Sequence, residues 1–134
     1  MSNYKIQKAG NILKKVEAKI SIPEGLKLHS FDLNVILGNL IDNATEAALQ
    51  TEEKLLKIMI NLDKGILFVN ICNSCQEIMI GENGKMKTTK SDPVNHGMGL
   101  KNVARIVEKY HGEMDFSYEN ESMEVEIIVY LKDM

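Results

Sequence analysis

The stretch NLIDNATEAAL, residues 39 to 49, places two asparagines in a segment whose apolar pattern predicts an amphipathic helix. Asparagine is a poor helix former because its side chain competes for backbone hydrogen bonds. Asn39 and Asn43 are four residues apart, so on a helix both amides lie on the same face. The pair therefore predicts a ligand or a buried partner.

A helical wheel places both asparagines at the edge of the apolar face. Measured from Leu40 at the centre of that face, Asn43 lies about 60° and Asn39 about 100° to the same side, and Glu46 continues this edge. The neutral amide oxygen of asparagine suits Mg²⁺, which takes oxygen ligands and keeps waters and phosphates in its shell. The plainer alternative is that both amides make local hydrogen bonds at the surface.

A second stretch that could bind a ligand is HGMGLKNVARIVEKYHG, residues 96 to 112. Gly97 and Gly99 come before an apolar-periodic pattern, so we expect them to precede a helix over residues 100 to 111. Glycines there let a ligand approach the backbone, and the free N–H groups of a helix N-terminus favour a phosphate. An ordinary turn before a helix is the simpler interpretation.

Three lysines of the preceding polar segment, Lys85, Lys87 and Lys90, would add positive charge near such an anion site. The segment over residues 79 to 97 is rich in Gly, Lys, Thr and Asn, so we expect a long loop. Taken alone, the lysines equally fit a solvated loop.

The rest of the chain supplies the elements that would position these residues. Period-2 patterns predict strands and period-3.6 patterns predict helices. The expected strands cover residues 16–22, 55–62, 66–72, 113–119 and 123–131, and the expected helices cover residues 3–15, 30–50 and 100–111. Strands interrupted by helices predict an α+β fold, a two-layer sandwich with a mixed, mainly antiparallel sheet of about five strands and helices on one face.

Two glycines mark the ends of these elements. DKG, residues 63 to 65, predicts a hairpin turn in which Gly65 takes a positive φ. Gly112 is expected to end the last helix.

The two cysteines, Cys72 and Cys75, form a CxxC pattern that fits a redox pair or half of a zinc site. A zinc site needs two further ligands, and the sequence has no second CxxC and no nearby histidine pair. A loop-like segment follows them, where a redox pair would open a helix. We therefore interpret them as reduced, structural thiols.

Composition limits the kind of protein. The chain has 134 residues, of which 44% are apolar and 26% charged, as expected for one soluble globular domain. The net charge of -3 argues against a nucleic-acid partner held by a broad basic face. No apolar run is long enough to span a bilayer.

Together, NLIDNATEAA, the strand hairpin, the lid-like loop and HGMGLKNV resemble the GHKL ATP-binding domain, which is the catalytic domain of sensor histidine kinases. The first motif matches that family's N box and the last its second glycine box. The resemblance covers residues 16 to 131, and the spacing of TTK and HGMGL over residues 88 to 100 is most similar to the Agr-type peptide quorum-sensing receptor kinases. It implies ATP held beneath a lid loop.

The resemblance implies roles by position. Asn43 matches the asparagine that binds the Mg²⁺ bridging the phosphates. Asn39 matches the position where hydrolysing relatives carry a glutamate that activates water, and because an amide cannot act as a general base, transfer is favoured over hydrolysis. The remaining ATP-binding residues implied by the match are Glu46, Lys90, His96, Gly97, Met98, Gly99 and Leu100.

One departure from the family pattern concerns adenine. The first glycine box, an aspartate followed by spaced glycines, is absent, and Asn73 stands where the aspartate would be. Period 2 puts Asn73 on the same face as Leu67, Val69 and Ile71. If this is the inner face, its carboxamide can accept from the adenine amino group and donate to a ring nitrogen. We interpret it as a variant site, with a weaker bond than a carboxylate makes.

We do not expect His29, His96 or His111 to be the phosphoacceptor, because none lies mid-helix beside an acidic residue with a second helix to pair with. The resemblance then implies that the acceptor lies on a separate dimerisation domain. We expect residues 1–15 to be the stub of that domain's helix, and residues 16–134 to be the ATP-binding domain.

The expected partners are this acceptor domain and, downstream, a response regulator. The parent is expected to be a homodimeric, membrane-anchored receptor in which this domain is cytoplasmic. Two alternatives share the fold: a protein serine kinase of the anti-sigma type, and a module that senses nucleotide without transferring phosphate. Asn39 disfavours the first, because hydroxyl activation favours a carboxylate there. The missing aspartate box supports the second.

Overall fold

The computed structural model describes residues 3–22, 30–76 and 93–130. This part of the chain forms three helices and five strands. In chain order these are α1 (Asn3–Ile12), β1 (Lys15–Ser21), α2 (Ser30–Leu49), β2 (Leu55–Asp63), β3 (Ile66–Ser74), α3 (Pro93–Lys109), β4 (Glu113–Glu119) and β5 (Ser122–Tyr130). Each expected strand is present within two residues of its predicted ends.

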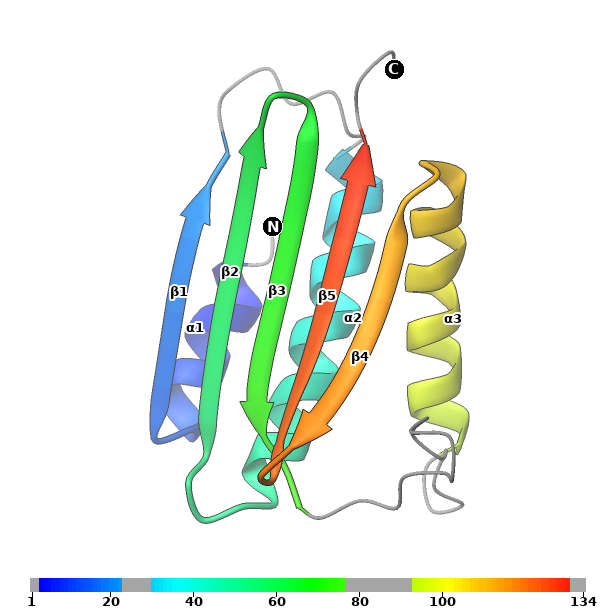
Figure 1. Cartoon of the computed structure of the whole chain (residues 1–134). Coiled ribbons are helices and arrows are strands. Elements are labelled where there is room, and N and C mark those ends of the chain that lie inside the picture. The colour runs from blue at the N-terminus through cyan, green and yellow to red at the C-terminus, as the bar shows by residue number, and fades with distance from the viewer. Residues whose placement is uncertain (1–2, 23–29, 77–92, 131–134) are drawn as a thin grey trace.

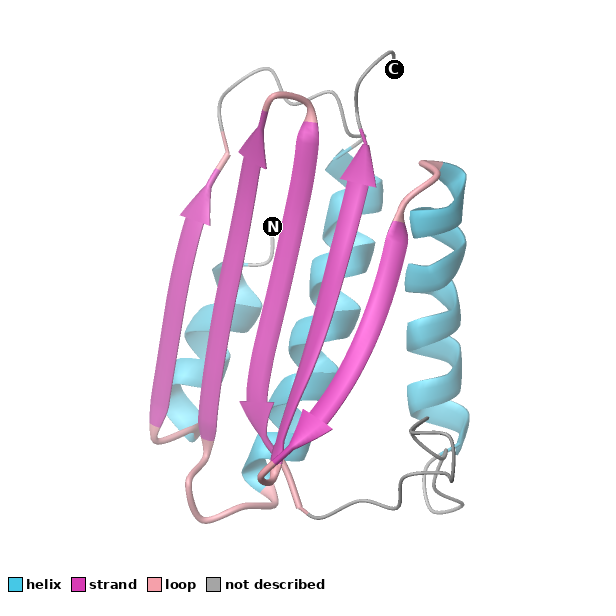
Figure 2. Ribbon diagram, viewed as in Figure 1, coloured by secondary structure: helices cyan, strands magenta, loops and turns pink. Residues whose placement is uncertain are grey.

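The strands form one mixed sheet in the order β1-β2-β3-β5-β4. β1 and β2 are parallel and are joined through α2, as a parallel pair requires a crossover connection. The other neighbouring pairs are antiparallel. The three helices lie on the same side of the sheet (Figures 1 and 2). The predicted two-layer α+β architecture is therefore confirmed.

The core lies between this sheet and the helices. The inward side chains of β3, Leu67, Val69 and Ile71, have no exposed surface. Ile36 and Ile41 of α2 pack into the same cluster and are almost fully buried. The buried stripe along α2 fixes the rotation of this helix, so it also fixes where the two asparagines point.

Two hairpins have two-residue turns. Lys64 and Gly65 both have positive φ, 53° and 79°, between the paired residues Asp63 and Ile66. This matches the turn type that suits the twist of a hairpin, and the prediction for Gly65 is confirmed. Asn120 and Glu121 make the corresponding turn between β4 and β5.

Helix α3 differs from the prediction at its start. It begins at Pro93, so Gly97 and Gly99 lie inside the helix and do not precede it. Proline suits the first turn of a helix because its missing N–H has no partner there. The expectation that the glycines sit before a helix N-terminus at residue 100 is therefore wrong, and the free N–H groups lie about one turn or more upstream.

The end of α3 also differs in detail. His111, with φ 57°, takes the left-handed conformation that was expected of a glycine. The amides of His111 and Gly112 donate to the carbonyls of Glu108 and Val107, which is the Schellman pattern. Gly112 is needed for another reason, because a Cβ there would lie 2.2 Å from the carbonyl oxygen of Ile128.

Candidate functional site

The candidate site is built around α2, which runs antiparallel to α3 and across β3. Contacts at both ends hold α2 in place. Near its end, the Thr51 hydroxyl lies 2.8 Å from the Ser74 hydroxyl at the end of β3. Near its start, Asp32 contacts the end of α3 through Lys109 and Tyr110. The asparagines lie between these two anchors.

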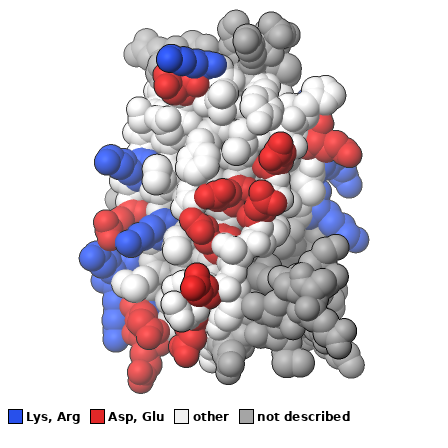
Figure 3. Space-filling model, viewed as in Figure 1, with Lys and Arg blue, Asp and Glu red and all other residues white. Residues whose placement is uncertain are grey.

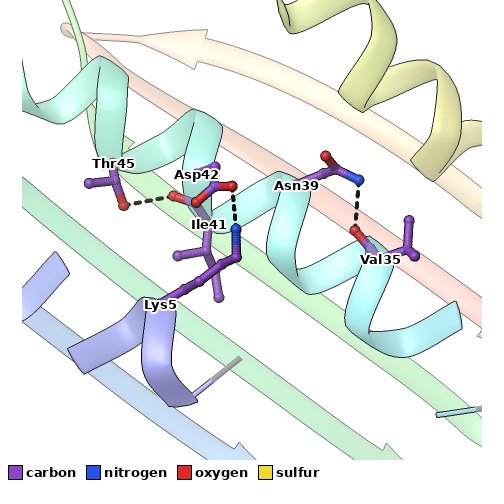
Figure 4. Close-up of polar contacts among 6 residues, drawn as sticks. All are labelled: Lys5, Val35, Asn39, Ile41, Asp42 and Thr45. Carbon is purple, nitrogen blue, oxygen red and sulfur yellow. Dashed lines mark hydrogen bonds and ion pairs between the residues drawn. The ribbon is translucent and has the colours of Figure 1, made fainter. Parts of the chain in front are cut away.

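Asn39 faces α3 from the middle of α2. Its Nδ2 donates to the carbonyl of Val35 at 2.9 Å, which is a local bond along the helix (Figure 4). Its Oδ1 lies 3.0 Å from where a Cβ on Gly99 would stand. The structure therefore brings Asn39 and Gly99 together, and Gly99 is the residue that lets the two helices approach here. The local-bond alternative holds for the Asn39 nitrogen.

Asn43 lies one turn further along and behaves differently. Among the described residues, its Nδ2 is the buried side-chain polar atom that has no hydrogen-bond partner. A buried unpaired donor costs about 1–3 kcal/mol, so an amide left in this state calls for a physical explanation. An amide can also be turned by 180°, which presents the oxygen in place of the nitrogen. The Nδ2 of Asn43 can therefore donate a hydrogen bond to a polar group that is not among the described residues.

The structure describes the side chains of only some of the other predicted ATP-binding residues. Glu46 is exposed on α2 and Leu100 is half-buried on α3. His96, Gly97 and Met98 belong to the first turns of α3, and their side chains lie outside the described residues. Lys90, with Lys85 and Lys87, also lies outside them.

Asn73 is on the inner face of β3, with only 5% of its surface exposed. It follows Leu67, Val69 and Ile71 on that face, so the period-2 prediction is confirmed. Its Nδ2 donates to the carbonyl of Ser74 at 2.9 Å. One amide hydrogen is used in this bond, while the other hydrogen and Oδ1 have no described partner.

The sequence reasoning missed the polar cluster that joins α2 to α3. The Asp32 carboxylate, 7% exposed, accepts from the Tyr110 hydroxyl at 2.7 Å and from Lys109 Nζ at 3.0 Å. The hydrogen bond to Asp32 raises the pKa of Lys109 above its ordinary value of 10.5. Tyr110 is buried, and a buried tyrosine needs a partner for its hydroxyl, which was the available signal.

A second missed contact joins α1 to α2. Lys5 forms an ion pair with Asp42, which stands between the two asparagines in the sequence (Figure 4). The lysine side chain passes over Gly38, where a Cβ would lie 3.5 Å from Lys5 Cε. Ala9 and Leu13 are buried in the common core, so α1 packs as part of this domain. That it continues a dimerisation helix stays a prediction.

The cysteines are free thiols. Burial raises the pKa of both Cys72 and Cys75, and nearby carboxylates, Glu124 and Glu121, raise them further. A raised pKa leaves little thiolate at neutral pH, so these thiols are poor nucleophiles. This favours the structural interpretation. Within the described ranges, no group of three or more His, Cys, Asp or Glu residues is arranged to hold a metal ion.

Comparisons with known proteins agree with this fold. A family model described as the GHKL domain matches residues 28–130. A probable C4-dicarboxylate sensor kinase of Halalkalibacterium halodurans is 32% identical over 114 residues, which is 81% of this chain and 21% of that protein. The chain thus spans about a fifth of this relative.

Solved histidine kinase structures share the fold. The catalytic domain of histidine kinase ThkA gives a TM-score of 0.67 at 19% identity, over 97% of this chain and 84% of that one. The histidine kinase domain of the Erythrobacter litoralis EL346 blue-light activated kinase gives 0.71 at 12% identity, over 97% and 61%. The Acinetobacter baumannii histidine kinase AdeS gives 0.62 at 15% identity, over 98% and 60%.

The chain therefore belongs to the GHKL domain family, and its fold is that of histidine kinase catalytic domains. No helix in the described ranges is both long and apolar enough to cross a membrane.

Proposed function

We propose that this chain is the ATP-binding catalytic domain of a sensor histidine kinase. It binds Mg-ATP and holds the γ-phosphoryl group for transfer to a histidine on a separate dimerisation domain. The observation that carries the proposal is the unpartnered amide of Asn43, one turn from Asn39 on the helix of a GHKL domain. A ligand that supplies phosphate oxygens and a metal ion satisfies that amide.

The residues present fit Mg²⁺ carried in by a nucleotide. The described residues offer no cage of carboxylates, so the ion must take most of its ligands from phosphates and water. Mg²⁺ is commonly bound in that way, through one or two protein oxygens. The Asn43 oxygen would be this protein ligand, and with the amide in its present orientation the nitrogen would donate to a phosphate oxygen.

Transfer is favoured over hydrolysis by Asn39. Its amide has no basic site that could activate a water molecule. Phosphoryl transfer needs accurate positioning and charge neutralisation more than covalent help from the protein, because charge in the transition state is spread over the phosphoryl oxygens. The roles of Glu46, Lys90, His96, Gly97, Met98 and Leu100 as ATP contacts belong to this proposal.

Adenine would be bound at the end of β3 by Asn73. Its Oδ1 and remaining amide hydrogen would supply an acceptor and a donor, which is the pair that the adenine edge requires. The serine kinase alternative is disfavoured by Asn39. The nucleotide-sensing alternative gains support from the lack of an aspartate at position 73.

The chain spans about a fifth of the sensor kinase relative. We propose that the parent is a homodimeric membrane receptor that carries the acceptor histidine and phosphorylates a response regulator. The spacing over residues 88–100 supports a relation to the Agr-type quorum-sensing kinases.

A transfer assay tests this proposal. The chain is mixed with Mg²⁺, ATP labelled in the γ-phosphate and the parent's purified dimerisation hairpin. We expect acid-labile label on the hairpin, as phosphohistidine gives. Acid-stable label on a serine would instead support the serine kinase, and nucleotide binding without any label would support the sensing module.

A further inference from the structure

The face of the sheet opposite the helices carries an uncovered surface with two distinct parts. In an antiparallel sheet, the face away from the core ordinarily shows polar residues. On β3 and β5 the outward positions near the β2–β3 hairpin are apolar, while β2 carries Asn61 and Asp63 there. Ile66 lies opposite Tyr130, and Phe68 lies opposite Ile128, on the adjoining strands β3 and β5. Ile66 and Tyr130 are 42% and 39% exposed.

Acidic side chains occupy the next outward positions along β5, while β3 carries Asn70 and Cys72 there. Glu126 and Glu124 follow Ile128 on β5, in steps of about 7 Å. Asp115 on β4 lies directly opposite Glu126. Figure 3 shows the carboxylates gathered over β5 and β4, with lysines nearer the β1 edge. Along β3 and β5 the surface therefore changes from apolar to acidic, and at the edges of the apolar end Glu113 lies opposite Ile128 and Asp63 lies opposite Ile66.

The sheet compensates for this arrangement only in part. Like charges placed directly opposite on neighbouring strands destabilise a sheet. Within the described residues no lysine or arginine forms an ion pair with Glu124, Glu126 or Asp115. Asn70 holds the two glutamates together, because its Nδ2 lies 2.6 Å from Glu124 Oε2 and 3.4 Å from Glu126 Oε2. The Ser117 hydroxyl also lies 3.5 Å from Glu124 Oε1, so hydrogen bonds reach these carboxylates without neutralising their charge. Residues that break a local rule are expected at functional surfaces.

We propose that this face is a docking surface for a protein segment that is apolar at one end and basic at the other. Charge complementarity selects the basic end, which lies over Glu124, Glu126 and Asp115. The apolar end covers Ile66 and Phe68. The surface is distinct from the nucleotide site, because α2 and α3 lie on the other side of the sheet (Figure 1). The proposal does not depend on the proposed function.

An NMR titration of the whole chain tests the docking surface. The probe is a short capped peptide with leucines in its first half and lysines in its second half. Its control is a peptide of the same composition in which leucine and lysine alternate. We expect amide shifts confined to β3, β4 and β5, with clearly weaker binding of the alternating peptide. Equal binding of the two peptides, or shifts on the helical face, would overturn the proposal.

Charge-removing variants locate the basic end. Glu124→Gln/Glu126→Gln is expected to weaken the probe about fivefold or more, since it removes two ion pairs of ordinary surface strength. The matched control, Glu52→Gln/Glu53→Gln, removes two exposed carboxylates elsewhere and should change the affinity less than twofold. Similar losses in both variants would contradict a specific surface.

Sedimentation of the chain without peptide tests whether a second copy of the chain, and not a different protein, covers this face. We expect a monomer, because the proposed partner is a different protein. Self-association that Glu124→Gln/Glu126→Gln alters would show that a second copy of the chain covers this face, and the proposal would fail.

Discussion

At the scale of single residues, Asn39 and Asn43 differ in their hydrogen bonding although they look equivalent in the sequence. Asn39 satisfies its nitrogen on its own helix and presents its oxygen toward α3. Asn43 keeps a buried nitrogen without a partner. Their shared face was predictable from a four-residue spacing. The difference was not, because it depends on which neighbours reach each amide after packing.

Replacing Asn43 by alanine should separate binding from stability. We expect Asn43→Ala to lose Mg²⁺-dependent binding of an ATP analogue while the protein becomes slightly more stable. The substitution removes an unpaired buried donor and improves helix propensity by about 0.6 kcal/mol. Calorimetric titration and thermal unfolding measure the two effects.

Asn34→Ala is the matched control for that experiment. Asn34 is exposed on the same helix, so the substitution gains the same propensity without touching the site. It should leave binding unchanged. Unaltered affinity in Asn43→Ala would contradict the metal assignment.

The adenine role of Asn73 predicts a different pattern. Asn73→Ala should weaken ATP and adenosine by the same factor, because both carry the base that we propose this amide to contact. One hydrogen bond in a buried site corresponds to about 0.5–1.5 kcal/mol, or a loss of roughly twofold to thirteenfold. Competition titrations with both ligands measure it, and a loss restricted to ATP would show that Asn73 acts on the phosphates.

At the scale of elements, the strands were predictable and the start of α3 was not. Alternating side chains in β2 and β3 show a clear period of 2, because one face is buried against α2. In HGMGL, the glycines suggested a turn, since glycine is a poor helix former. The helix nevertheless runs through them, because Gly99 packs against Asn39 where a larger residue would be crowded. Pro93, typical of a first turn, was the overlooked signal.

Gly99→Ala tests this close approach. The new Cβ would lie 3.0 Å from Asn39 Oδ1, so the amide or α3 must shift by a few tenths of an ångström. We expect weaker nucleotide binding. Stability should change little, because crowding offsets a propensity gain of about 1 kcal/mol.

Gly10→Ala in α1 provides the comparison for Gly99→Ala. Nothing lies within 4 Å of its Cβ position, so this variant should be more stable and bind nucleotide normally. Equal nucleotide affinity in both variants would show that the contact between Gly99 and Asn39 does not shape the site.

At the contact between α2 and α3, the two residues that bind Asp32 should contribute unequally to the free energy of unfolding. Tyr110→Phe removes a buried hydrogen bond to a carboxylate and should lower the free energy of unfolding by about 2 kcal/mol. Lys109→Met should cost less, because the Lys109 side chain is 60% exposed. Chemical denaturation measures both, and a larger loss in Lys109→Met would contradict this assignment.

The Lys109 contribution also has a predicted pH dependence. Its pKa is raised in the folded protein, so the stabilisation is fully present below pH 10.5 and is lost as the pH rises above that value. The difference in stability between the wild-type chain and Lys109→Met should therefore vanish in strongly alkaline solution. A difference that persisted there would indicate a packing effect of the lysine stem.

At the scale of the whole molecule, the layer of helices and the sheet give the described part of the protein two different surfaces. The helical side carries Asn39, Asn43 and Gly99, and the inner end of β3 adds Asn73. The outer side of the sheet carries the apolar and acidic docking surface. The sequence motifs indicated the first face. The second face became visible only with the strand register, which sets Glu126 beside Asp115 and Phe68 beside Ile128.

The most direct test of the central claim is a calorimetric titration of the chain with a non-hydrolysable ATP analogue, with and without Mg²⁺. We predict binding that strengthens markedly when Mg²⁺ is present and that Asn43→Ala loses. Binding of equal strength in both solutions would contradict the assignment of Asn43 to the metal. No binding at millimolar analogue, for this chain and for its full-length parent, would contradict the proposal that the domain holds Mg-ATP.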